Sequence, residues 1–514
     1  MMATMHRLRL SSCLPLLRAL GVVALLASPV SRAQDAPLPA PITEALQRAG
    51  MAPSALSLLV WPVDTPTPRL AHLATTPRPF ASVMKLFTTG AGLLTLGPAW
   101  TWSTDTALGG PLSPDGVLNG SLYIKGQGDP ALLQEHVSLM VNRWRAAGLR
   151  EIRGDIVFDR QWLAVPAHDP AAFDGRPLRP YNAGPDALLV NHQSVVLRFV
   201  PDASRPGQIR VAMDPPLDGV ELHTQLTIKA EASCGDWREA MDLRMAPIKG
   251  WHKEGLSRWS IQLRGPYPLS CGEKDWPVLW QGDGPGDLAA RLLHAAWRQA
   301  GGTLKGQIKD GTWPQEAAAW QRWTSPPLGS IVRDINKFSN NVMARQLFLT
   351  QATAPLQTGT DSTSTPSPAT LDAARARVSA VVRQATTHAA NHTPCDGEAL
   401  VLDNGSGLSR MERTSAMCLG EWLQVLWRSP VMPELMASLP ITSVDGTTKR
   451  WQGAAGYAHI KTGSLDGVSA LGGYVDGQSG RRQVVVAVVQ YPRNEAIRPV
   501  MEAILNWARQ DLPN

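Results

Sequence analysis

The sequence is poor in charge and in long apolar runs, and both shortages exclude classes of protein. Only 18% of its 514 residues are charged, and the basic ones are scattered along the chain. Because no Lys/Arg block is interleaved with aromatic residues, the net charge of +6 indicates a mildly basic surface and not a nucleic-acid-binding patch. No later stretch approaches the ~18 continuous apolar residues of a membrane-spanning helix. A hydrophobic fraction of 44% predicts a globular protein with a sizeable core.

Several catalytic motifs are also missing. The chain has no C-x-x-C pair, no H-E-x-x-H and no clustered histidines, which argues against a zinc or redox site and against a metallopeptidase. It has no G-x-S-x-G, so the nucleophile elbow of an α/β-hydrolase is unsupported. Its glycines form neither G-x-G-x-x-G nor a Walker sequence, so no phosphate-binding loop is predicted. We therefore expect no metal and no cofactor.

The N-terminus carries the pattern of an export signal. Basic residues precede an apolar stretch over residues 19–27, and small residues at Ser31 and Ala33 fit a signal-peptidase site before Gln34. We therefore expect residues 1–33 to be a signal peptide and the mature protein to be periplasmic and soluble. The apolar stretch is too short to span a bilayer, which makes an uncleaved anchor the weaker alternative.

Cysteine is scarce, with five residues in the chain. Cys13 lies inside the expected signal peptide, ahead of its apolar stretch. The other four are an even number in an exported protein, which allows two disulfides with three possible connectivities. We favour the pairing of near neighbours, which joins Cys234 to Cys271 and Cys395 to Cys418.

The length predicts two or three domains, and 42 prolines with 44 glycines predict many turns. Before residue 103 we expect a helix, a strand hairpin and a second helix that begins at Ser82. Residues 190–282 have the pattern of short strands, and residues 351–370 that of a flexible polar loop. The expected elements of the rest of the chain are helices at 288–299 and 331–349, strands at 457–463, 469–475 and 483–490, and a helix at 497–509.

Three short motifs carry the chemistry. Ser82 and Lys85 form the only S-x-x-K, at the start of a predicted helix, where a spacing of three puts both side chains on one face. Ser339 and Asn341 form an S-x-N on a segment that is either helical or a loop. Lys461 begins the only K-T-G, on a predicted strand. Each motif alone is common by chance, but all three in this order, each on a suitable element, are not.

This set meets the requirements of nucleophilic catalysis. A serine hydroxyl attacks well only when a base takes its proton, and Lys85 can do so only as a neutral amine. Burial and a second cation, Lys461, would both lower its pKa. Ser339 could pass the proton to a leaving amine, and Asn341 could bond to a substrate amide. The backbone N–H groups of Ser82 and of Ser464, just past the K-T-G, could stabilise an oxyanion.

Together the three motifs resemble those of the penicillin-binding proteins and serine β-lactamases. Further stretches narrow the match to the D-alanyl-D-alanine carboxypeptidase/endopeptidase family, the class C low-molecular-weight penicillin-binding proteins (peptidase family S13). The resemblance covers nearly all of the mature chain. The stretches that carry it lie at 122–130, 181–185 with 190–191, 403–409 and 445–447.

The resemblance implies an α+β fold. A transpeptidase-like catalytic domain, with an antiparallel sheet between helices (34–103 and 319–514), would be interrupted by a large insert of two smaller β-rich domains, one formed by 104–189 with 283–318 and the other by 190–282. It also implies catalytic roles for Ser82, Lys85, Ser339, Asn341 and Lys461, and substrate or oxyanion contacts at Thr462, Gly463 and Ser464. Class A β-lactamases have Asp where this chain has Asn340, a side chain that we expect to point away from the substrate.

The implied activity is hydrolysis of D-Ala-D-Ala ends and D-Ala cross-links in peptidoglycan stem peptides, with β-lactams as acylating inhibitors. The sequence leaves open the balance of carboxypeptidase and endopeptidase activity and the identity of the diamino acid. One alternative is a serine β-lactamase, although that domain requires no insert of this size. Another is a catalytically silent peptidoglycan-binding scaffold of the same fold, which would have no reason to keep all five catalytic residues.

Overall fold

The computed structural model of the chain describes residues 37–251, 256–353, 367–390, 395–493 and 496–511. The predicted signal peptide, residues 1–33, lies outside the described residues, as does the segment 354–366 of the predicted loop at 351–370. Within the described ranges, no helix combines the length and apolar character that crossing a membrane requires.

The central sheet has five strands in the order β19-β20-β21-β1-β2, with every neighbouring pair antiparallel. The predicted hairpin near the N-terminus and the three predicted strands near the C-terminus are all confirmed. The strands are β1 (Leu56–Pro62), β2 (Leu70–His72), β19 (Ala458–Leu465), β20 (Val468–Asp476) and β21 (Arg482–Gln490).

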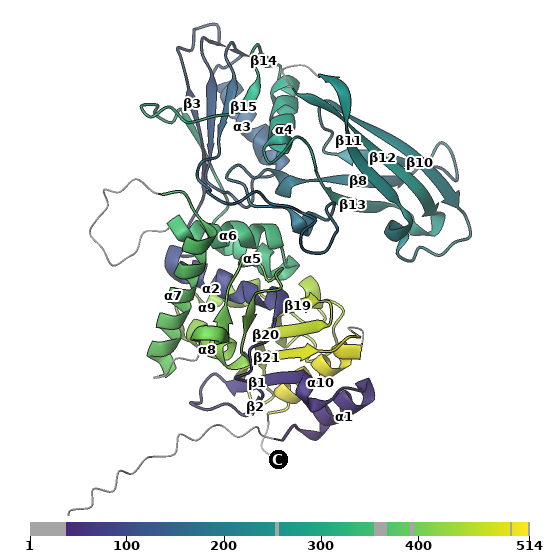
Figure 1. Cartoon of the computed structure of the whole chain (residues 1–514), viewed down its shortest axis with the longest axis vertical. Helices are drawn as coiled ribbons and strands as arrows, with labels where there is room; N and C mark the ends of the chain where they lie inside the picture. Colours follow the sequence, from purple (N-terminus) through teal and green to yellow (C-terminus); the bar gives the residue numbers. More distant parts are fainter. Residues whose placement is uncertain (1–36, 252–255, 354–366, 391–394, 494–495, 512–514) are drawn as a thin grey trace, which may run out of the picture. The chain divides into compact units, whose positions relative to one another are not determined.

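Both faces of this sheet are covered by helices (Figure 1). On one face lie α1 (Ala40–Ala49) and α10 (Ile497–Arg509), which pack against Val485 and Val489 of β21. On the other, α2 (Lys85–Leu96) and α8 (Ala416–Arg428) share a core with Val484 and Val486. A strand buried on both faces reads as a continuous apolar run, which is why β21 shows no alternation of polar and apolar residues.

The predicted helix at 331–349 is wrong in one respect, because the structure divides it into α5 (Leu328–Phe338) and α6 (Asn341–Thr353). Ser339 ends α5 in the left-handed conformation, with φ 57°. Asn340 then caps α6, since its Oδ1 accepts the Met343 N–H at 3.1 Å. The Ser339–Asn341 motif therefore lies at a sharp turn between two helices. Beyond it come α7 (Leu371–Ala390), α9 (Met432–Ser438) and the short strands β17 (Leu400–Val401) and β18 (Arg413–Thr414).

Between α2 and α5 the chain builds separate sheets around a core of their own. The largest has five strands in the order β15-β7-β5-β3-β16, and three others have three strands each: β14-β6-β4, β13-β8-β9 and β10-β12-β11. Helices α3 (Gln134–Ala146) and α4 (Asp287–Gln299) add apolar side chains to the same core. The strands are β3 (Ser103–Leu108), β4 (Val117–Leu118), β5 (Leu122–Gly126), β6 (Glu151–Ile152), β7 (Ile156–Asp159), β8 (Ser194–Pro201), β9 (Ile209–Asp214), β10 (Val220–Lys229), β11 (Asp242–Trp251), β12 (Ser257–Pro268), β13 (Lys274–Leu279), β14 (Thr303–Leu304), β15 (Ile308–Asp310) and β16 (Gln321–Thr324).

These sheets confirm a mixed α+β fold in which an antiparallel sheet between helices is interrupted by a β-rich insert. The exact domain limits stay a prediction, and one strand bears on them: β16, which follows the predicted boundary at 319, pairs with β3 in the insert sheet. The favoured disulfides are confirmed, with Cys234 bonded to Cys271 and Cys395 to Cys418.

Candidate active site

Ser82 lies in a short 3₁₀ turn, η2 (Ala81–Met84), that leads directly into α2. The preceding Ala81 has φ 49°, a left-handed conformation that is strained for a residue with a Cβ. Two glycines allow other backbone segments to approach this turn. A Cβ on Gly407 would lie 1.9 Å from the Ala81 oxygen, and one on Gly463 would lie 2.9 Å from the Ser82 nitrogen. The turn is therefore held between β19 and the loop that contains Gly407.

Lys85 lies one helical turn after Ser82, and its side chain is fully buried. Its Nζ is 2.8 Å from Ser82 Oγ, 2.6 Å from Asn341 Oδ1 and 2.5 Å from the Ser406 carbonyl oxygen. Burial lowers the pKa of Lys85 well below its ordinary value, and the positive charge of Lys461 lowers this pKa further. These are the conditions under which a lysine side chain is a neutral amine.

Lys461 lies on β19 and is also fully buried. Its Nζ donates to Ser339 Oγ at 3.0 Å and to the Thr462 carbonyl at 2.6 Å. Burial lowers its pKa to about 7. Ser339 is thereby connected to the second lysine, whereas Asn341 is connected to the first.

The structure brings the predicted site residues together around one cleft of about 770 Å³. Ser82, Ser339, Asn341 and Ser464 line it, so the two backbone segments proposed for the oxyanion contact border the same space. The two buried lysines bond to residues that line it: Lys85 to Ser82 and Asn341, and Lys461 to Ser339. Thr462 contacts Thr447 through their hydroxyl groups at 2.8 Å.

Part of the cleft wall was not anticipated from the sequence, because it comes from the insert. The cleft is lined on this side by four residues of the insert and by Arg410 of the catalytic part; the four are Phe173, Asp174, Arg176 and Tyr181. The Tyr181 hydroxyl donates to Asp174 Oδ2 at 2.8 Å, which orders this segment. The wall thus presents charges of both signs. These residues follow no periodic pattern, and only the stretch that begins at Tyr181 gave a signal, through its family resemblance.

Sequence reasoning also missed Glu412. Its side chain is 2% exposed, and it lies near Lys85 and Arg345 in the interior. A buried carboxylate beside a buried lysine is an informative feature, but a single Glu after the 403–409 stretch has no sequence signature. Across the described ranges, no group of three or more His, Cys, Asp or Glu residues is arranged to hold a metal ion.

An antiparallel sheet between helices, with a serine beside a buried lysine at the start of a helix, defines a serine-type hydrolase. The comparisons with known proteins agree. The family model described as "D-Ala-D-Ala carboxypeptidase 3 (S13) family" matches residues 38–511. A D-alanyl-D-alanine carboxypeptidase from a species of Actinomadura is 29% identical over 422 residues, which are 78% of this chain and 71% of the relative.

Two solved structures have the same fold. Penicillin binding protein 4 (DacB) from Haemophilus influenzae superposes with a TM-score of 0.69 at 18% identity, over 91% of this chain and 98% of that one. Its complex with a β-lactam gives a TM-score of 0.65 at 19% identity, with the same coverage. Because the family model spans most of the sequence, the chain belongs to the D-Ala-D-Ala carboxypeptidase 3 (S13) family of peptidoglycan peptidases.

Proposed function

We propose that the protein is an exported D,D-peptidase that hydrolyses D-Ala-D-Ala ends and D-Ala cross-links of peptidoglycan through an acyl ester on Ser82. The observation that carries the proposal is the arrangement around Lys85. Asn341 Oδ1 and the Ser406 carbonyl accept the two hydrogens of a neutral amine, which leaves the nitrogen lone pair for the Ser82 hydroxyl at 2.8 Å. Lys85 in this state is a general base within hydrogen-bond reach of the nucleophile.

Acylation follows from this arrangement. Lys85 Nζ takes the hydroxyl proton while Ser82 Oγ bonds to the carbonyl carbon of the penultimate D-Ala. The oxyanion that forms lies between the backbone N–H groups of Ser82 and Ser464. When the C–N bond breaks, Ser339 gives its proton to the leaving amine. Lys461, which donates to Ser339 Oγ, is placed to return a proton to that hydroxyl. Water then hydrolyses the ester: its OH bonds to the acyl carbon, Lys85 returns to Ser82 Oγ the proton that it took, and the proton released from water replaces the one that Lys461 gave up.

Binding of the substrate uses the same groups. A cationic Lys461 attracts the terminal carboxylate of the stem peptide or of a β-lactam, and Asn341 bonds to the peptide amide. The relatives, a D-alanyl-D-alanine carboxypeptidase and a penicillin binding protein in complex with a β-lactam, support this choice of substrate and inhibitor. The predicted signal peptide supports a periplasmic location. We retain Thr462 and Gly463 as substrate-contacting positions on β19.

The first experiment is the intact mass of the mature protein after brief exposure to benzylpenicillin. We expect a stable one-to-one adduct in the wild type and no adduct in Ser82→Ala, because the variant lacks the attacking oxygen. D-Alanine release from a purified muropeptide should disappear in the same variant. Removal of a nucleophile costs about 10⁴-fold or more in rate, so the loss is easily measured.

Each other outcome contradicts the proposal in a different way. Consumption of the antibiotic without an adduct would mean rapid deacylation and therefore a β-lactamase. An intact antibiotic and no adduct, in folded protein that binds peptidoglycan, would mean a silent scaffold. An adduct that persists in Ser82→Ala would assign the nucleophile to another residue.

A further inference from the structure

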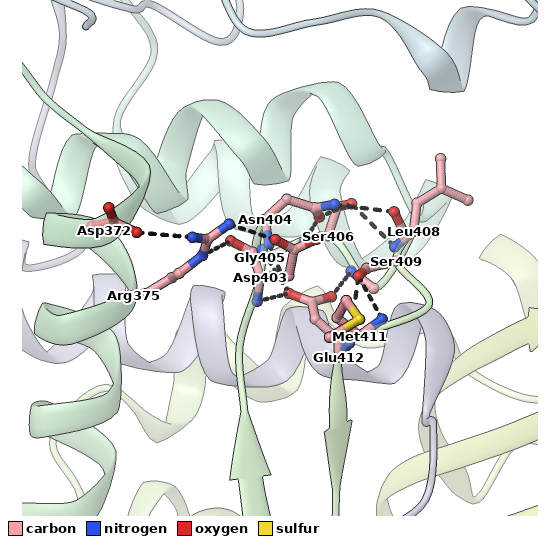
Figure 2. A network of polar contacts seen from close by, with 11 residues as sticks. Asp372, Arg375, Asp403, Asn404, Gly405, Ser406, Leu408, Ser409, Met411 and Glu412 are labelled. Carbon is pink, nitrogen blue, oxygen red and sulfur yellow. Dashed lines mark hydrogen bonds and ion pairs between the residues drawn. The ribbon is translucent and has the colours of Figure 1, made fainter. Parts of the chain in front are cut away.

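The buried carboxylate of Glu412 is surrounded by backbone N–H groups (Figure 2). Its Oε1 accepts from Asp403 at 3.0 Å, from Asn404 at 3.1 Å and from Gly405 at 2.8 Å. Its Oε2 accepts from Gly407 at 2.7 Å. One side chain therefore gathers four backbone donors of a five-residue segment, 403–407.

The segment has the backbone geometry of an anion-binding nest. Gly405 and Gly407 have φ 73° and 77°, and alternation of such residues with ordinary ones turns successive N–H groups toward one side. Here the anion is supplied by the same chain. Burial raises the pKa of Glu412, and its backbone hydrogen bonds act in the opposite direction. Because the four partners named above are all donors, the charged carboxylate fits this environment.

Two carbonyl groups of the same segment face α2. The Gly405 carbonyl accepts from Thr88 Oγ1 at 2.6 Å, and the Ser406 carbonyl accepts from Lys85 Nζ at 2.5 Å. Lys85 and Thr88 are three residues apart on one helix face. The segment thus connects Glu412 on its N–H side to the general base of the proposed reaction on its C=O side.

We infer that Glu412 is a positioning residue for the reaction: by holding the backbone N–H groups of Gly405 and Gly407 it fixes the Ser406 carbonyl, which orients the Lys85 amine toward Ser82. The inference rests on the proposed function of Lys85 as the base. Loss of the Glu412 contacts would release one of the two acceptors that direct the amine hydrogens, and the lone pair would no longer point steadily at the hydroxyl.

A second support for the same carbonyl comes from Asn404. Its Oδ1 accepts from the Ser406 N–H at 3.0 Å and from the Ser406 hydroxyl at 2.6 Å. Arg375, by contrast, contacts only the outer end of the segment: its Nε donates to the Asp403 carbonyl at 2.8 Å and its Nη2 to Asp403 Oδ1 at 2.5 Å. Substitution of Asn404 should therefore also displace the Ser406 carbonyl. Arg375 offers a matched control in the same network (Figure 2).

The test is stopped-flow acylation of the purified mature protein by nitrocefin, which separates the binding constant K from the acylation rate constant k2. In Glu412→Gln one backbone donor must face the new amide NH2 group, so the segment shifts. We expect k2 to fall about 100-fold with K nearly unchanged, because misplacement of a reacting group by about 1 Å costs that much. Glu412→Asp, which keeps the charge on a shorter side chain, should recover part of the rate.

Arg375→Ala should keep k2 within about threefold of the wild type, because it leaves the Ser406 carbonyl in place. If Glu412→Gln does not fold, Asn404→Ala carries the test, and the same selective fall in k2 is expected. Wild-type k2 in a folded Glu412→Gln or Asn404→Ala variant would overturn the inference and leave the proposed function intact. An equal fall of k2 in Arg375→Ala would also overturn the inference, because a general loosening of the loop would then explain the slower acylation. A wild-type protein that is not acylated at all would overturn the proposed function, and the inference with it.

Discussion

At the scale of single residues, the site is governed by two lysines that are both fully buried. Desolvation favours the neutral amine of each, but their surroundings differ. Burial, together with the positive charges of Lys461 and Arg345, holds the pKa of Lys85 well below its ordinary range, and the negative charge of Glu412 acts in the opposite direction. The pKa of Lys461 is about 7, so near pH 7 the free protein contains both the charged and the neutral form of this lysine. The first lysine is thus suited to accept a proton and the second to meet an anion.

This difference predicts how ligand binding depends on pH. The ordinary pKa of 10.5 is lowered to about 7 in Lys461, so the fraction of free protein with a charged Lys461 falls as the pH rises through 7. A ligand carboxylate binds the charged form, so its affinity should weaken by up to about tenfold per pH unit above that point. We would measure K for benzylpenicillin from about pH 6 to about pH 9.

The methyl ester of benzylpenicillin is the matched control, because it lacks the carboxylate. Its K should change little over the same range. Parallel curves for the acid and the ester would show that Lys461 does not bind the carboxylate.

At the scale of secondary structure, the geometry of the proposed site depends on how closely β19 approaches the turn that carries Ser82. A Cβ on Gly463 would lie 2.5 Å from the Phe80 oxygen, 2.9 Å from the Ser82 nitrogen and 3.0 Å from the Val83 nitrogen. All three are backbone atoms, which cannot rotate away as a side chain can. The glycine of the K-T-G motif is therefore required by packing, independently of any contact with substrate.

Gly463→Ala should accordingly move β19 away from the nucleophile. We expect acylation by benzylpenicillin to slow about 100-fold and the protein to lose about 1–3 kcal/mol of stability. Gly329→Ala in α5 is the control, since a Cβ there would have no neighbour closer than 3.6 Å and alanine favours a helix. Acylation rates and chemical denaturation of both variants test the point. Unchanged acylation in Gly463→Ala would contradict it.

Most helices and strands, but not all, could be predicted from the sequence. Residues with strong periodicity gave correct elements, and the helix at 497–509 was predicted with its exact bounds. For the Ser339–Asn341 motif we expected either a helix or a loop. The break itself was not placed, because the apolar pattern of α5 continues in phase into α6, and a serine seldom adopts a left-handed conformation. The strand β11 (Asp242–Trp251) was missed because Pro247, which has no N–H group for the ladder, lies within its alternating pattern.

The candidate site was also predictable only in part. Its motif residues were found because their chemistry requires fixed spacings along one element. Glu412 was not found because its partners are backbone N–H groups of residues 403–407, which no side-chain spacing reveals. Asp174 was not found because it reaches the cleft only through the fold of the insert. Whether the five motif residues perform the assigned roles stays a prediction.

At the scale of the whole molecule, the insert contributes directly to the cleft and is joined to the catalytic part through α6. Gln346 of α6 makes two hydrogen bonds to the backbone of Asp186, donating to its carbonyl at 2.7 Å and accepting from its N–H at 3.2 Å. Its neighbour Arg345 donates to the Ala183 carbonyl at 2.7 Å. These contacts lie a few residues after the wall segment 173–181, so they fix that wall relative to Ser339 and Asn341 on the same helix region.

The last prediction follows from this connection. Gln346→Ala removes both bonds to Asp186, so the wall should be held less firmly while Ser82 and Lys85 keep their geometry. Under the proposed function, we expect benzylpenicillin to occupy only the space beside Ser82 and the longer stem peptide to reach the wall segment 173–181. We therefore expect kcat/KM for a pentapeptide muropeptide to fall about tenfold, and the acylation rate with benzylpenicillin to stay within about threefold of the wild type.

Gln483→Ala is the matched control, because it removes a buried glutamine that donates to the Ala508 carbonyl at 2.8 Å on the opposite face of the sheet. Each buried hydrogen bond that is lost should cost about 1–3 kcal/mol of stability, so the temperature of thermal unfolding should fall in both variants, and further in Gln346→Ala, which loses two bonds where Gln483→Ala loses one. Only Gln346→Ala should change the ratio of peptide hydrolysis to acylation. If both variants changed this ratio equally, general destabilisation would explain it, and if neither did, the insert would hold the wall without help from Gln346.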